Sequence, residues 1–119
     1  MSDAKQGKQT PELREEIIRL GPWHHDVQVT PEISTSVFLE APEGTYSSSP
    51  SFINPLDLLA NTMHKVYPEG LERRTFLDCA CNAGGYCFAA KELGASDCFG
   101  FDARKHWIDQ ARFLAENRV

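Results

Sequence analysis

The chain has 119 residues, of which 41% are hydrophobic, and its 12 basic and 17 acidic side chains give a formal net charge of −5. This length allows one domain with a modest core, and the absence of a long apolar run or a signal-like start predicts a cytoplasmic protein without a membrane partner. Between residues 21 and 75 seven acids face three bases, which argues against a broad nucleic-acid-binding face in that segment, and we expect no DNA partner.

The first part of the chain predicts a flexible N-terminus followed by a helix and a short strand. Residues 1–9 are polar, and Thr10-Pro11 is a typical helix start. The apolar face of this helix comprises Leu13, Ile17 and Leu20, and Gly21-Pro22 ends it. The alternation in residues 27–30 predicts a half-buried strand.

Trp23, His24 and His25 lie between that helix and that strand. Adjacent histidines in an extended segment face opposite ways, so we expect no metal site there. A packing role and a substrate-facing role both remain open for Trp23 and one of the histidines. Residues 41–52 are rich in Pro, Gly and Ser and predict a loop, either an ordinary solvated loop or a lid with Tyr46 as a stacking residue.

A second helix is predicted from Asn54-Pro55 to Tyr67, and Pro68-Glu69-Gly70 turns the chain. The segment FLDCACNAGGYCFAAKELGASDCFGFD, residues 76–102, then carries the most specific pattern in the chain. A strand ends near Asp78, small residues follow, and a helix over residues 86–93 stops at Gly94. A second strand, residues 98–101, ends at Asp102.

This layout predicts a nucleotide-type cofactor site. Small residues let a ligand approach the backbone, and the first N–H groups of the following helix favour an electron-rich group. An acid at the end of the second strand is placed to accept hydrogen bonds from a ribose diol. The glycine triplet G-x-G-x-x-G of dinucleotide-binding folds is absent.

The order of Asp78, Ala80, Asn82 and Gly84 resembles the motif D-x-G-x-G-x-G of class I S-adenosylmethionine-dependent methyltransferases. The "CNAG" form is similar to a subset that includes enzymes modifying the wobble uridine of transfer RNA. The resemblance implies that S-adenosyl-L-methionine is the cofactor and that a small molecule or RNA is the acceptor. It implies a cofactor site made of Asp78, Ala80, Cys81, Asn82, Ala83, Gly84 and Asp102.

Two residues depart from the family motif. Asn82 replaces a glycine, and asparagine tolerates the left-handed backbone region well. Ala80 also replaces a glycine, and it is acceptable there only if its φ is negative, because a positive φ would cost about 1–2 kcal/mol.

The resemblance implies a Rossmann-like three-layer α/β fold with a parallel sheet, here incomplete and preceded by N-terminal helices. On this interpretation, residues 10–70 form a cover segment and residues 71–119 form the first βαβα half of a truncated methyltransferase domain. A missing C-terminal half or a partner chain would complete the sheet, and a complete small two-layer domain is the alternative. No catalytic residue is assigned, since acceptor-side residues of the family come mostly from later strands.

Two other functions stay open: an NAD(P)-dependent oxidoreductase segment and a non-catalytic interaction module with a vestigial loop. The four cysteines fit buried packing thiols better than a metal site or a disulfide framework. A final helix is predicted over residues 104–118. Its core-facing stripe comprises Trp107, Ile108, Ala111, Leu114 and Ala115.

Overall fold

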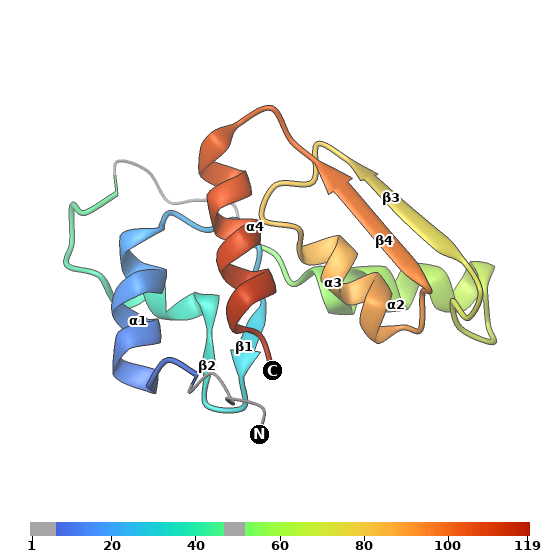
Figure 1. Ribbon diagram of the computed structural model, residues 1–119, viewed down its shortest axis with the longest axis horizontal. Helices are drawn as coiled ribbons and strands as arrows, with labels where there is room; N and C mark the ends of the chain where they lie inside the picture. Colours follow the sequence, from blue (N-terminus) through green and yellow to red (C-terminus); the bar gives the residue numbers. More distant parts are fainter. Residues whose placement is uncertain (1–6, 47–51) are drawn as a thin grey trace, which may run out of the picture.

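The computed structural model describes residues 7–46 and 52–119, and it is a mixed α/β fold. Residues 1–6 of the expected flexible N-terminus and residues 47–51 of the expected loop lie outside the described residues. In chain order (Figure 1) the elements are α1 (Thr10–Arg19), β1 (Gln28–Thr30), β2 (Ile33–Ser34), the 3₁₀ helix η1 (Thr35–Glu40), α2 (Pro55–Val66), β3 (Thr75–Cys79), α3 (Gly85–Glu92), β4 (Asp97–Phe101) and α4 (Lys105–Asn117). All four predicted helices and the three predicted strands are confirmed, whereas β2 and η1 were not predicted. No helix in the described part of the chain is long and apolar enough to cross a membrane.

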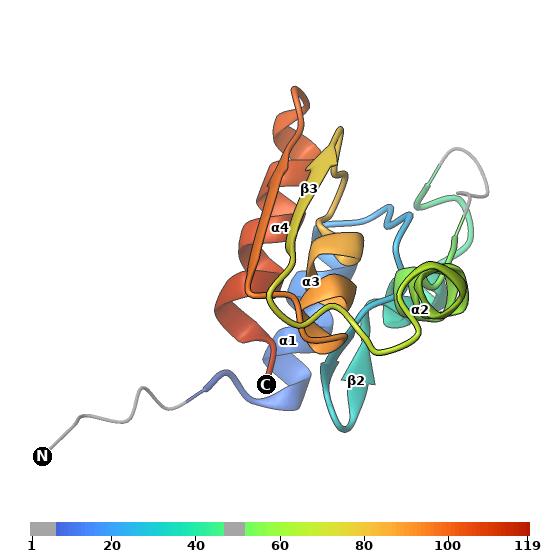
Figure 2. The ribbon, with the colours of Figure 1, turned by 90° about the vertical axis from the view of Figure 1, so that its right-hand side faces the viewer.

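Strands β3 and β4 form a two-stranded parallel sheet, with Thr75 opposite Asp97 and Cys79 opposite Phe101. Both strands therefore end at the same edge, as their arrowheads show in Figure 1. Helix α3 crosses between them and packs on one face, and α2 packs on the far side of α3 (Figure 2). The other face of the sheet exposes Leu77, Phe99 and Phe101.

Helix α3 ends as its sequence predicts. Gly94 has a φ of +103°, and its N–H donates to the carbonyl of Lys91 while the N–H of Ala95 donates to the carbonyl of Ala90. These two bonds form a Schellman motif, which glycine allows at no steric cost. Strand β4 can therefore start three residues after Gly94, parallel to β3.

Helix α4 stands between the sheet and the N-terminal part of the chain (Figure 1). Its Phe113 and Leu114 join a core with residues of α1, β1, β2 and η1, and Gln110 is fully buried. The predicted stripe is therefore partly wrong, because Ala115 is exposed. The helix turns its largest buried residues toward the N-terminal part, while Ile108 and Ala111 line a shallow groove along β4.

A second core lies between α2, α3 and the sheet. It contains Tyr86, Ala89 and Ala90 of α3 and Leu93 directly after it, together with Phe76 of β3 and Cys98 of β4. Asn54 caps α2, since its side chain accepts a hydrogen bond from the N–H of Asp57 at 3.1 Å. This core holds α3 on the sheet and so fixes the loop that precedes α3.

Candidate functional site

The loop between β3 and α3 has three left-handed residues at alternate positions. The φ angles are +61° at Ala80, +55° at Asn82 and +80° at Gly84. The expectation for Asn82 is confirmed, but the condition of a negative φ at Ala80 is not met. The chain must turn at Ala80 so that the next N–H, that of Cys81, can donate to the carbonyl of Phe101 at 2.8 Å. An alanine held in this region carries about 1–2 kcal/mol of strain.

Asp102 ties this loop to the end of β4. Its Oδ2 accepts a hydrogen bond from the N–H of Asn82 at 3.0 Å, and its Oδ1 accepts one from the N–H of Arg104 at 2.9 Å. The N–H groups of Arg104 and Asn82 lower the pKa of Asp102. The side chain is therefore ionised at neutral pH and is fixed relative to the loop, and each oxygen keeps a further lone pair for a ligand.

Asp78 lies on the sheet face that α3 covers, one position before the carboxyl end of β3. Burial raises the pKa of Asp78, and the neighbouring Asp102 carboxylate raises it further. The Asp78 carboxylate forms no hydrogen bond or ion pair with residues 7–46 or 52–119. The structure thus brings two predicted acids to one edge of the sheet, and one of them has no partner there.

Three predicted site residues face the interior. Ala83 is fully buried and joins the core of α1 and α4, and Cys81 is 3% exposed. A Cβ atom built on Gly100 would lie 2.8 Å from the Cβ of Cys81, so the loop packs closely on β4. Gly84 is buried as well. These residues can meet a ligand through their backbone rather than through their side chains.

His25 supports the start of α3. Its ring is buried, and its Nδ1 accepts a hydrogen bond from the N–H of Gly85 at 3.1 Å. Burial, aided by His24, lowers the pKa of His25 to about 4, so the ring is neutral at physiological pH. Tyr86 packs edge-on against it, with the ring centroids 5.4 Å apart. Sequence reasoning missed this contact, since the partners are sixty positions apart and no local pattern joins them.

The other candidate substrate residues pack in the N-terminal part. Trp23 is fully buried, and its Nε1 donates to the carbonyl of Ile17 at 2.8 Å. His24 packs on Trp107, with ring centroids 4.7 Å apart. Tyr46 donates its hydroxyl to the carbonyl of Ile18 and packs on a phenylalanine of η1. Trp23 shares its core with Ala83 of the predicted cofactor loop, and His25 bonds to Gly85 directly after that loop.

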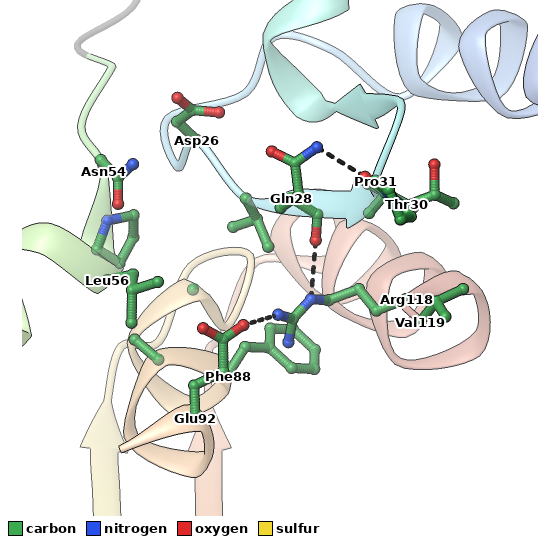
Figure 3. A pocket seen from close by; sticks show the side chains of 15 residues that line it. Asp26, Gln28, Thr30, Pro31, Asn54, Leu56, Phe88, Glu92, Arg118 and Val119 are labelled. Carbon is green, nitrogen blue, oxygen red and sulfur yellow. Dashed lines mark hydrogen bonds and ion pairs between the residues drawn. The ribbon is translucent and has the colours of Figure 1, made fainter.

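A cavity of about 410 Å³ lies behind α3, between that helix, β1, the start of α2 and the last two residues (Figure 3). In Figure 3, Arg118 pairs with Glu92, and its Nε donates to the carbonyl of Gln28 at 3.0 Å. The guanidinium also lies 4.9 Å from the centre of the Phe88 ring. Gly85 directly follows the loop and Phe88 contacts Gly84, but neither Asp78 nor Asp102 lines this cavity. It is therefore separate from the edge of the sheet where the two acids meet.

The edge of the sheet offers both negative charge and free donors. Among the described residues, the N–H groups of Tyr86 and Cys87 in the first turn of α3 have no acceptor, whereas that of Gly85 donates to His25. Such groups at the positive end of a helix attract electron-rich ligand atoms. Two carboxylates nearby attract a cation or hydroxyl groups. The arrangement therefore suits a ligand that combines a positive charge, a diol and an electron-rich group.

No protein-family model matches the chain, and no curated protein and no solved structure matches it. Within residues 7–46 and 52–119, no group of three or more His, Cys, Asp or Glu side chains could hold a metal ion. The functional assignment therefore depends on the geometry of the loop and its two acids.

Proposed function

We propose that the protein acts in methyl transfer from S-adenosyl-L-methionine, with this chain supplying the cofactor-binding half of a Rossmann-like domain. The observation that carries the proposal is the left-handed backbone at Ala80, Asn82 and Gly84. These are the three positions that are glycine in the motif D-x-G-x-G-x-G. A positive φ is the physical reason for glycine at such positions, so the backbone follows the motif even where the residue does not.

Each part of the cofactor has a matching group. Asp102 would accept hydrogen bonds from the ribose hydroxyls through the lone pairs that its two backbone contacts leave free. Asp78 would lie toward the cationic sulfonium end, where a positive charge would offset the burial and the repulsion by Asp102 that raise its pKa. The free N–H groups of Tyr86 and Cys87 would receive an electron-rich group of the cofactor.

When bound, the cofactor supplies an activated methyl group on a sulfonium. The contribution of this chain is then orientation and exclusion of water, which can lower a barrier by several kcal/mol. The hydrogen bonds from the loop to Phe101 and Asp102 would serve this purpose, because they fix the backbone on which the cofactor would rest. The acceptor would be a small molecule or RNA, and no catalytic residue is assigned.

Isothermal titration with S-adenosylhomocysteine, and separately with NAD, tests the proposal. We expect S-adenosylhomocysteine to bind and NAD not to bind. Asp102→Asn should weaken binding about tenfold or more, because a charge-assisted hydrogen bond contributes roughly 1.5–3 kcal/mol. Asp97→Asn is the matched control, since Asp97 is exposed at the opposite end of the same strand.

Three results would contradict the proposal. Binding of NAD alone would point to an oxidoreductase segment. Binding of neither ligand, or equal binding by the wild type, Asp78→Asn and Asp102→Asn, would indicate an interaction module whose loop holds no cofactor.

A further inference from the structure

We infer that His25 is a positioning residue for the cofactor loop: through the Gly85 N–H it sets which backbone donors at the start of α3 remain open to a ligand. The inference rests on the proposed function, because it concerns the same loop. His25 belongs to the N-terminal part of the chain and is far from the motif in sequence. Its role would make the N-terminal segment a component of the cofactor site.

The fit between His25 and Gly85 is close. A Cβ atom built on Gly85 would lie 2.6 Å from the Nδ1 of His25 and 2.6 Å from the Cγ of Pro55. Any larger residue at position 85 would therefore push the imidazole away and break the hydrogen bond. Glycine at this position is required by the approach of the ring rather than by its own backbone angles, since Gly85 has no positive φ.

The backbone of His25 is held from both sides, so the ring has a fixed base. Its carbonyl accepts a hydrogen bond from the Thr35 hydroxyl at 2.7 Å. The neighbouring residues pair with Ile53: the N–H of Asp26 donates to the Ile53 carbonyl at 2.7 Å, and the N–H of Ile53 donates to the His24 carbonyl at 2.9 Å. Movement of the N-terminal segment would consequently move the ring and, through it, the start of α3.

The direction of the Gly85 hydrogen bond fixes the tautomer of the ring. Because a backbone N–H donates to Nδ1, this nitrogen must be unprotonated and the proton of the neutral ring lies on Nε2. Gly85 therefore has no N–H available for a ligand, whereas Tyr86 and Cys87 keep theirs. His25 in this way selects the second and third donors of the helix for the cofactor.

Two substitutions separate positioning from simple packing. Asn can place its side-chain oxygen where the Nδ1 of His25 lies, whereas Leu fills similar space without an acceptor. We expect His25→Leu to bind S-adenosylhomocysteine about three- to tenfold more weakly than the wild type, as for one lost neutral hydrogen bond, and His25→Asn to bind within about twofold. Circular dichroism and urea titration show whether each variant is folded under the titration conditions.

Nitrogen-15 NMR of the wild type provides a second measurement that needs no variant. The ring should show an unprotonated Nδ1 and a protonated Nε2. On addition of S-adenosylhomocysteine, the amides of Tyr86 and Cys87 should shift more than that of Gly85, whose N–H stays on His25. A protonated Nδ1, or a Gly85 amide that shifts most, would overturn the inference whether or not His25→Leu folds.

The outcomes distinguish this inference from the proposed function. If the wild type binds S-adenosylhomocysteine and a folded His25→Leu binds it equally well, the positioning role is wrong and the proposed function stands. Equal weakening in the Asn and Leu variants would also reject the positioning role, because the acceptor would then be irrelevant. No binding by the wild type would overturn both.

Discussion

Replacing Ala80 by glycine should stabilise the protein, although it removes a side chain. Ala80 has a φ of +61°, and an alanine in that region carries about 1–2 kcal/mol that glycine avoids. Glycine in turn increases the entropy of the unfolded chain, which costs about 0.4–1 kcal/mol. The Ala80 side chain is exposed, so no buried methyl group is lost. The free energy of unfolding should therefore rise by up to about 1.5 kcal/mol.

Urea denaturation at pH 7 measures this difference, and Ala83→Gly in the same loop is the control. Ala83 is fully buried and is not among the residues of positive φ. Its replacement should lower the free energy of unfolding by about 1–2 kcal/mol, from a lost buried methyl group and added chain entropy. If Ala80→Gly destabilises the protein as much as Ala83→Gly does, the strain assigned to Ala80 does not exist.

Three further outcomes test the charges and caps described above. Asp78→Asn should raise the free energy of unfolding at pH 7, because a raised pKa means that the ionised form destabilises the fold; in urea titrations the gain should vanish near pH 3, where the wild-type carboxyl is protonated as well. Asp102→Asn should lower stability by about 1–2 kcal/mol at pH 7. Since the pKa of Asp102 is lowered, the difference from the wild type should stay constant down to about pH 5 and shrink only below about pH 4; a difference that already fades at pH 6 would contradict the assignment. Gly94→Ala should cost about 1 kcal/mol by thermal unfolding, because φ at Gly94 is +103°, and an unchanged midpoint would refute its role as the helix stop.

Local chemistry explains which features could be predicted from the sequence. The end of α3 at Gly94, the cap at Asn54 and the strand ending at Asp102 depend on residues within a few positions of one another. The meeting of Asp78 and Asp102 at one edge follows from the parallel arrangement of two strands joined by a helix.

The features that escaped prediction depend on contacts between distant segments. Helical periodicity identified an apolar stripe on α4, but that helix has neighbours on two sides, and the larger core lies around Phe113 and Leu114. The φ of Ala80 is set by a hydrogen bond from the N–H of the next residue to the carbonyl of Phe101. The backbone propensity of alanine does not predict such a contact. The contact of His25 with Gly85 likewise exists only once the N-terminal part has packed against α3.

The tryptophans and the cysteines of this protein lie in different parts of the fold. Both tryptophans lie around α4: Trp23 in the core that α4 shares with the N-terminal part, and Trp107 on α4 itself. All four cysteines are free thiols on the sheet, its loop or α3. Tryptophan fluorescence therefore reports on the half made of α4 and the N-terminal part, and thiol labelling reports on the half made of the sheet, its loop and α3. Coincident transitions by these two probes would show that the halves unfold as one cooperative unit, and separate transitions would reveal an intermediate with only one half formed.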